Sequence, residues 1–125
     1  DEAIKLYERA IEKDSMYALA YAGAGFAYGR KYFFTNEVKW MDLATNRSQK
    51  AVQINDQLSE VWVAVGRVHY QKGDLDGAVT ALERACELDP ENYEAQRRLG
   101  TAYQKIKHYE NAEIAFKKAI SLQPN

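Results

Sequence analysis

The chain has 125 residues, one cysteine and a formal net charge of −1 at pH 7. This length is enough for one compact domain or a short repeat array, which excludes most multidomain enzymes. Seventeen Lys and Arg against eighteen Asp and Glu argue against a nucleic-acid-binding surface, and 46% hydrophobic residues exclude a disordered chain. Because only two prolines and seven glycines interrupt the sequence, we expect a largely helical protein.

Residues 1–17 are expected to form a single helix. Ala3, Tyr7 and Ala10 lie three or four positions apart, so they share one helical face. The helix corresponds to the second helix of a repeat whose first helix precedes the chain. We therefore expect the chain to be an excised piece of a longer array. The alternative is a native chain that ends here and dimerises through its array ends.

Residues 18–58 are expected to form a helical hairpin that is longer than those that follow it. When the sequence is shifted by 41 positions, Tyr21, Gly25 and Tyr28 align with residues on the apolar face of the first helix of the next unit. In the second half of the unit, Ala44 matches at a shift of 34. Seven additional residues therefore lie between the two stripes.

Residues 59–92 form the next predicted hairpin. Apolar and small residues recur at i, i+3, i+4 and i+7 around Gly66 and again around Ala78, which predicts two amphipathic helices. The pair Gly73-Asp74 between them indicates a helix end followed by a helix start, because glycine suits a left-handed C-terminal cap and aspartate can cap the next helix. Pro90 closes the unit.

Residues 93–125 repeat the preceding unit. A shift of 34 positions carries its glycine, alanine and proline onto Gly100, Ala112 and Pro124. The sequence therefore predicts a last helical hairpin, and the whole chain divides into 1–17, 18–58, 59–92 and 93–125.

The aligned positions resemble the pattern of the tetratricopeptide repeat family, which is W-x-x-L-G-x-x-Y, then A-x-x-x-F, then P, at a period of 34. In the middle unit the pattern positions hold Trp62, Val65, Gly66, His69, Ala78, Leu82 and Pro90. The sequence departs from the pattern at Gln96, Ser48 and Lys107, where a large apolar residue, an aromatic residue and a glycine are usual. The resemblance implies an all-α fold, a right-handed α-solenoid of antiparallel helix hairpins.

In that family the first helices line a concave groove that holds peptides or partner helices. The resemblance implies that the groove-facing positions are the binding site, and these hold Phe26, Glu60, Val63, Arg67, Tyr70, Glu94, Arg97, Thr101 and Gln104. Aromatic and guanidinium groups are typical of interface hot spots. We expect Arg67 and Arg97 to pair with acidic side chains of a ligand, and Glu60 and Glu94 to reject acidic groups at the neighbouring position.

Some family members bind acidic chaperone tails through a clamp of lysines and asparagines. The corresponding positions hold Ala22, Phe26, Ala64, Glu94 and Arg98. Only the arginine fits such a clamp, so we expect no chaperone-tail carboxylate clamp.

The seven additional residues amount to about two helical turns, so we expect one extra turn on each helix with Thr35-Asn36 at the tip. Either side chain can cap the second helix there. Large apolar residues gather around this tip: Tyr32, Phe33, Phe34, Val38, Trp40 and Met41. We favour internal packing for them, and Phe33, Phe34 and Trp40 form a possible second binding surface. A disordered loop between ordinary helices is the alternative geometry.

The residues with reactive side chains do not combine into a site. Cys86 lies in a column with Ile11, Val52 and Ile120, which predicts a structural core position. His69 is expected to be a core or half-buried imidazole and His108 a solvated turn residue. Without a metal-ligand spacing or a catalytic motif, we expect no enzyme activity, no metal and no cofactor.

We therefore favour a cytoplasmic scaffold or adaptor segment that binds a protein or peptide, with no nucleic acid and no membrane span. Two alternatives remain open. One is a regulatory or substrate-recognition segment of a larger enzyme, such as a bacterial signalling protein, and the other is a self-assembly module.

Overall fold

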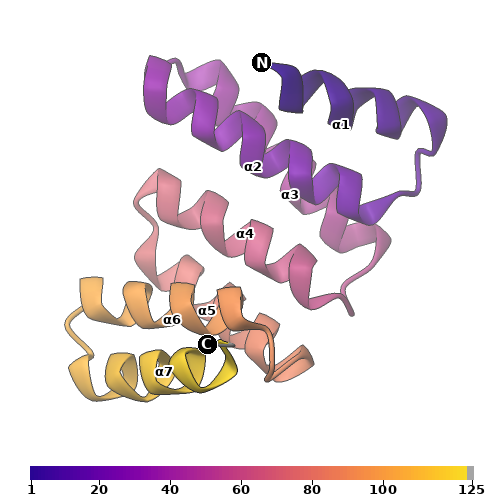
Figure 1. Cartoon of the computed structure of the whole chain (residues 1–125). Coiled ribbons are helices and arrows are strands. Elements are labelled where there is room, and N and C mark those ends of the chain that lie inside the picture. Colours follow the sequence, from indigo (N-terminus) through magenta and orange to yellow (C-terminus); the bar gives the residue numbers. More distant parts are fainter. Residues whose placement is uncertain (124–125) are drawn as a thin grey trace.

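A computed structural model describes residues 1–123, which fold into α-helices without any strand in that range (Figure 1). The predicted closing residue Pro124 lies outside the described residues. The seven helices are α1 (Glu2–Lys13), α2 (Ala18–Thr35), α3 (Val38–Ile54), α4 (Ser59–Lys72), α5 (Leu75–Leu88), α6 (Tyr93–Lys105) and α7 (Tyr109–Leu122).

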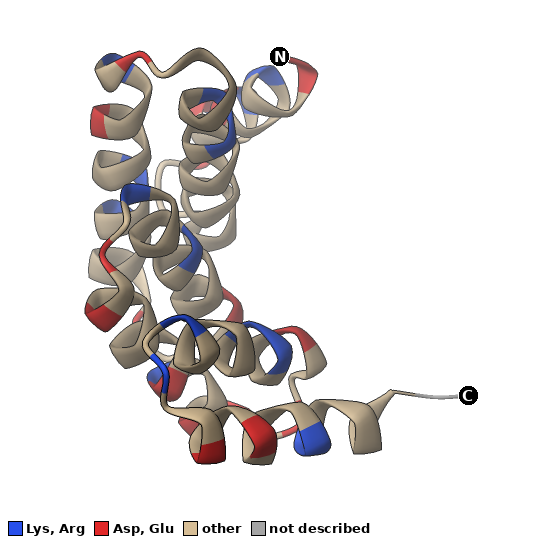
Figure 2. Cartoon of the chain, turned by 90° about the vertical axis from the view of Figure 1, so that its left-hand side faces the viewer, with Lys and Arg blue, Asp and Glu red and all other residues tan. Residues whose placement is uncertain are grey.

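The helices pair in chain order into antiparallel hairpins. Helix α2 packs against α3, α4 against α5, and α6 against α7, while α1 packs on α2. Successive hairpins contact each other through α2 and α3 with α4 and through α5 with α6. A smaller contact joins α4 to α6, so the three first helices α2, α4 and α6 lie in one layer. Figure 2 shows that this layer borders the open side of a curved array. The arrangement confirms the predicted all-α helical solenoid.

Side-chain and glycine caps set several helix ends, and those at Gly73 and Asp74 were predicted from the sequence. Gly73 ends α4 in the left-handed conformation, with φ of +86°. The Asp74 side chain then accepts a hydrogen bond from the Gly77 amide at 3.0 Å and caps α5. Asn92 caps α6 in the same way through the Ala95 amide at 3.1 Å. These caps let short connections reverse the chain direction.

Small residues close the hairpins. A Cβ atom on Gly66 would lie 2.7 Å from Leu82 Cγ, and one on Gly100 would lie 2.8 Å from the Phe116 ring. Glycine at these positions therefore lets the paired helices approach closely. Ala78 on α5 is fully buried and faces the same contact.

The first hairpin is longer than the others by the seven residues that the sequence predicted. Helices α2 and α3 have 18 and 17 residues, while α4 and α5 have 14 each. The extra length is helical up to the tip, so no disordered loop of seven residues lies here.

The predicted caps at this tip are wrong. Helix α3 begins after Glu37, and no side chain caps its first turn. Asn36 is the C-cap of α2 in the left-handed conformation, with φ of 59°, so Glu37 and not Asn36 occupies the position that precedes α3. The Thr35 hydroxyl donates to the Lys31 carbonyl at 2.9 Å and accepts from the Glu37 amide at 3.3 Å, so it stays tied to α2.

The apolar residues around the tip divide into two groups. Met41 is buried, and Tyr32 and Trp40 pack against the cluster that contains it. Phe33 and Phe34 are 73% and 78% exposed. Val38 is also exposed, at 66%, so internal packing accounts for three of the six residues and leaves Val38 and the two phenylalanines in solvent.

The last helix carries apolar side chains that no described residue covers. Ile114 and Ile120 on α7 are 68% and 70% exposed. The expected core position of Ile120 is therefore wrong. The equivalent residues Val52 and Cys86 pack against hairpins that follow them, whereas no hairpin within residues 1–123 follows α7.

Candidate interaction groove

Two adjoining hollows lie on the layer formed by α2, α4 and α6. The first, here called the arginine pocket, has a volume of about 310 Å³ and is lined by Phe26, Phe33, Gly66, Arg67, Tyr70, Gln71, Leu82, Arg97, Arg98 and Thr101. The second hollow has a volume of about 240 Å³ and is lined by Tyr7, Leu19, Ala22, Gly23, Phe26, Glu60, Val63, Ala64, Arg67, Asn92 and Glu94. Phe26 and Arg67 line both hollows, and the two hollows together are here called the groove.

Arg67 and Phe26 make the wall shared by the two hollows. The Arg67 Cζ atom lies 3.1 Å from the centroid of the Phe26 ring. The Arg30 Cζ atom is 5.6 Å from the same centroid. Guanidinium groups at such distances over an aromatic face are attracted by its quadrupole. The contact also joins α2 to α4 across the groove.

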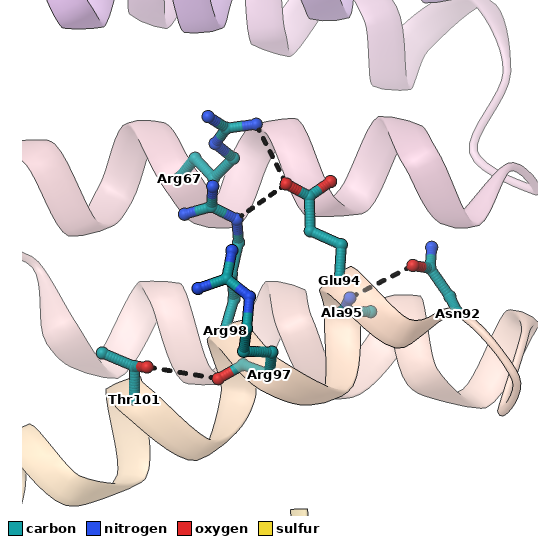
Figure 3. Close-up of polar contacts among 7 residues, drawn as sticks. All are labelled: Arg67, Asn92, Glu94, Ala95, Arg97, Arg98 and Thr101. Atoms are coloured by element: carbon teal, nitrogen blue, oxygen red, sulfur yellow. Dashed lines mark hydrogen bonds and ion pairs between the residues drawn. The ribbon is translucent and has the colours of Figure 1, made fainter. Parts of the chain in front are cut away.

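Glu94 holds two arginines through one carboxylate oxygen. Its Oε2 atom is 3.4 Å from Arg67 Nη1 and 3.1 Å from Arg98 Nε (Figure 3). Arg97 lines the arginine pocket together with Arg67 and Arg98. The close-up shows the guanidinium groups of these three residues in a row, one from α4 and two from α6. Figure 3 draws the Asn92 cap beside them, and this cap fixes the start of α6 and the position of Glu94.

The surroundings of Arg67 disfavour its positive charge. Burial is the largest cause and lowers the pKa of this guanidinium to about 10, and the charge of Arg98 acts in the same direction. Glu94 opposes both effects. Burial and the neighbouring guanidinium of Arg98 therefore destabilise the charged form of Arg67 more than Glu94 stabilises it.

The structure brings most of the predicted groove residues together. Phe26, Arg67, Tyr70, Arg97 and Thr101 line the arginine pocket, and the second hollow includes the predicted Glu60, Val63 and Glu94. Gln104 lines neither hollow and is exposed near the end of α6. That any of these residues binds a partner stays a prediction.

Sequence reasoning missed several contributions to the groove, among them Arg98, Phe33 and Tyr7. Phe33, which the sequence pattern placed on a separate surface, lines the arginine pocket beside Phe26. The spacing of seven residues between them on α2 is a signal that could have placed both on one face. Tyr7 from α1 lines the second hollow, a position that depends on how α1 packs on α2.

The possible second surface does not form one patch. Phe33 and Phe34 make an edge-to-face pair with centroids 5.4 Å apart. Trp40 instead stacks on Tyr28, with centroids 6.0 Å apart and an interplanar angle of 10°. Lys31 Nζ lies 4.0 Å from the Trp40 centroid and adds a cation to the same ring. Trp40 is therefore part of the packing of the first hairpin.

The reactive side chains are held in structural surroundings. Burial, with the charges of Glu83 and Asp89, raises the pKa of the Cys86 thiol to about 11. His69 is half-buried, with Nδ1 3.1 Å from Asp74 Oδ2, and His108 is exposed and stacks on Tyr103. Within residues 1–123, no group of three His, Cys, Asp or Glu side chains lies close enough to hold a metal ion.

Across the described part of the chain, none of the helices combines the length and the apolar character that a membrane crossing requires.

Two sequence models of one family match the second half of the chain. The first, described as a TPR repeat, matches residues 66–107, and the second, described as a tetratricopeptide repeat, matches residues 93–125. The chain is a tetratricopeptide repeat protein. The matched segments contain α6 and all three arginines of the arginine pocket.

Two curated proteins illustrate how the chain relates to longer proteins. It is 25% identical over 121 residues to anaphase-promoting complex subunit 3 of Schizosaccharomyces pombe, a match that covers 97% of this tetratricopeptide repeat chain and 17% of the relative. It is 32% identical over 100 residues to heat shock protein STI1 of Saccharomyces cerevisiae, covering 79% of the chain and 16% of the relative. The chain thus spans about one-sixth of the length of these relatives.

A solved structure shares the fold of the whole chain. The crystal structure of a thermophilic TPR protein of Thermus thermophilus superposes with a TM-score of 0.87 at 19% sequence identity. The match covers 98% of this tetratricopeptide repeat chain and 65% of that protein. At this identity the likeness shows the fold alone.

Proposed function

We propose that this tetratricopeptide repeat segment is a scaffold or adaptor that binds a partner polypeptide in the groove formed by α2, α4 and α6. The observation that carries the proposal is the groove in which Arg67 lies over Phe26 and shares Glu94 with Arg98. Aromatic and arginine side chains are the residues most enriched among interface hot spots. Binding in the groove requires no chemistry from the protein, and we propose that the segment has no catalytic role.

The names of the relatives support a role in assembly or recognition. One is a subunit of the anaphase-promoting complex, and another, from Yarrowia lipolytica, is a peroxisomal targeting signal receptor. We infer that this segment likewise contacts proteins or peptides rather than nucleic acid. Its one cysteine is free, which suits a reducing compartment, and we propose a cytoplasmic location.

The groove differs from the lysine and asparagine clamp that some tetratricopeptide repeats use for chaperone tails. Among the corresponding positions, Ala22 and Ala64 are buried small residues and Glu94 is an acid. Arg98, which could serve in such a clamp, is instead paired with Glu94. We therefore propose that the partner is not held by that clamp.

A second candidate function is a regulatory or recognition segment of a larger enzyme. The chain covers only a small part of the length of its relatives, and this favours a full-length protein that contains further domains. A third is self-assembly, which the exposed Ile114 and Ile120 on α7 favour because apolar side chains of this size are rarely left in solvent as a group.

Affinity capture with variants tests the groove against these alternatives. The segment is immobilised and exposed to an extract of its source, and captured proteins are identified for the wild type and for Tyr70→Ala and Arg97→Ala. Each groove truncation should cost about 1–3 kcal/mol of binding free energy and deplete the same partner. Lys118→Ala, an exposed change on α7, is the matched control and should leave capture unchanged.

Two outcomes would move the site elsewhere. If the captured proteins are the same for wild type and both groove variants, the groove is excluded as the binding site. Loss of capture, or a loss of self-association in sedimentation, with Ile120→Asp alone would assign function to the exposed face of α7.

A further inference from the structure

We propose that the arginine pocket binds an acidic side chain that is followed by a large apolar residue within a partner polypeptide. This inference rests on the proposed function and names the kind of segment that the groove takes. It commits to an internal Asp or Glu of the partner as the source of the carboxylate.

The charges around the pocket favour an anionic group from a partner. Three arginines line it, and no acidic side chain does among the described residues. Glu94, on the adjoining hollow, gives one oxygen to two of them, Arg67 and Arg98. Within residues 1–123 the Arg97 side chain makes no ion pair, so at least one guanidinium in the row has its donors available.

Arg67 adds a second sign of incomplete pairing. Its Nε atom is buried and has no hydrogen-bond partner among the described residues. The pKa of Arg67 is also lowered, because burial and the charge of Arg98 together outweigh the effect of Glu94. A carboxylate seated beside it would compensate this charge, and guanidinium groups match the planar geometry of a carboxylate.

The other residues that line the pocket favour a large apolar residue next to the acidic residue in the partner sequence. Phe26, Phe33 and Tyr70 contribute rings to the pocket, and Leu82 adds an aliphatic side chain. Phe33 is 73% exposed in the free protein, so an apolar side chain of a partner would remove it from water. A volume of about 310 Å³ is the size of a small ligand site and accommodates one or two side chains.

The elongated first hairpin supplies part of this pocket. Phe33 lies in the last turns of α2, beyond the length of the other first helices, and follows Phe26 by seven residues on the same helical face. The extension therefore adds an apolar wall next to the row of arginines.

An internal segment fits the shape of the groove better than a chain terminus. The two hollows adjoin at Phe26 and Arg67, so a partner chain that passes over this contact would reach both. The second hollow contains Glu60 and Glu94, which favours a polar or basic residue of the partner at that side.

Pools of short peptides test the proposal without a known partner. The probes are fluorescein-labelled hexapeptide pools with amidated C-termini, in which two adjacent positions are fixed and the others are mixed. Glu followed by Phe or Leu should bind the segment about tenfold tighter than Gln followed by the same residue, or Glu followed by Ala. The preference should weaken as salt is raised, because the recognised group is charged.

Matched variants locate the binding. Arg97→Gln removes an exposed guanidinium without an ion pair and should abolish the preference for Glu over Gln while the segment stays folded by circular dichroism. Phe33→Ala should abolish the preference for Phe or Leu over Ala. Arg9→Gln, an exposed change on α1 outside both hollows, should alter neither preference.

Several results would overturn the proposal. Tightest binding by pools with a fixed Lys or Arg, or no preference among the pools, would exclude an acidic ligand. The same pools with a free C-terminal carboxyl group complete the test, and binding by these but not by the amidated pools would exclude an internal segment.

The outcomes also separate this inference from the proposed function. If other pools bind and Tyr70→Ala weakens them, the groove is a binding site and only the acidic specificity fails. If peptide binding is unchanged in Tyr70→Ala, Arg97→Gln and Phe33→Ala, both fail.

Discussion

The hydroxyl group of Tyr28 donates a hydrogen bond to Glu8 Oε2 at 2.7 Å and joins α2 to α1. The same oxygen accepts from Arg47 on α3, with Nη2 at 2.9 Å and Nε at 3.0 Å. One carboxylate therefore ties three helices together. Because α1 packs mainly on α2 within the described chain, this group is an important anchor for α1.

Removing that carboxylate should loosen α1. We expect Glu8→Ala to lower the free energy of unfolding by about 1–2 kcal/mol, since charged hydrogen bonds are lost from a partly exposed site. Urea denaturation measures the change, and faster amide exchange in α1 should accompany it. Glu12→Ala, an exposed change on the same helix, is the control and should stay within about 0.5 kcal/mol. Equal effects of the two substitutions would contradict the anchoring role.

The same group predicts a dependence of stability on alkaline pH. Burial, together with the hydrogen bond and charge of Glu8, raises the pKa of Tyr28 from 10.0 to about 12. A pKa that is raised on folding contributes stability that is complete below pH 10 and is lost as the pH rises towards 12. Tyr28→Phe lacks this group, so the difference in unfolding free energy between wild type and variant should shrink across that window.

Denaturation of both proteins at a series of pH values checks this expectation. Glu8→Gln offers a matched control, because it removes the negative charge that helps to raise the tyrosine pKa, so its alkaline loss of stability should be smaller and should end at a lower pH. Parallel stability curves for wild type and Tyr28→Phe would show that the tyrosine does not titrate with unfolding.

Gly66→Ala should destabilise the protein although alanine favours helices. The new Cβ would meet Leu82 Cγ at 2.7 Å, and Leu82 is fully buried and cannot move aside easily. Overpacking costs about 1–3 kcal/mol, which exceeds the gain of about 1 kcal/mol in helix propensity. Thermal unfolding measures the net loss. Gly100→Ala should cost less, because its neighbour Phe116 is half-buried, and the opposite order would refute the packing argument.

Trp40→Ala and Phe34→Ala should separate internal packing from exposed surface at the hairpin tip. Trp40 stacks on Tyr28 and packs against the core cluster, so its loss should cost about 2–3 kcal/mol of unfolding free energy. Phe34 is 78% exposed, and its loss should stay within about 0.5 kcal/mol. Chemical denaturation measures both. A weakened partner interaction in Trp40→Ala with unchanged stability would make the tip the functional surface.

Cys86 should react slowly with thiol reagents in the native protein. Its pKa is raised from 9.0 to about 11, so the reactive thiolate is rarer in the folded state, by on the order of 100-fold near pH 8. The rate of reaction with a disulfide reagent, compared between native and urea-unfolded protein, measures this protection. Similar rates in both states would mean that the thiol is exposed in the native array.

Much of the fold could be predicted from the sequence, because helix stripes, caps and the period are local properties of the chain. The shift of 34 positions, the cap at Gly73-Asp74 and the length of the first hairpin all follow from patterns that can be read along the chain itself. The helical face of a residue such as Arg67 follows from the same periodicity. For that reason most of the groove-facing residues could be named in advance.

Only the tertiary structure decided how those residues interact. Glu94 was expected to repel acidic ligands, yet its carboxylate is occupied by Arg67 and Arg98, because the stacking of α4 on α6 sets their side chains within reach. Phe33 joins the pocket for a similar reason, and Ile120 is exposed because no described hairpin follows its own. Contacts between helices that are distant along the chain depend on packing geometry, and a repeating pattern in the sequence does not specify which side chains then meet.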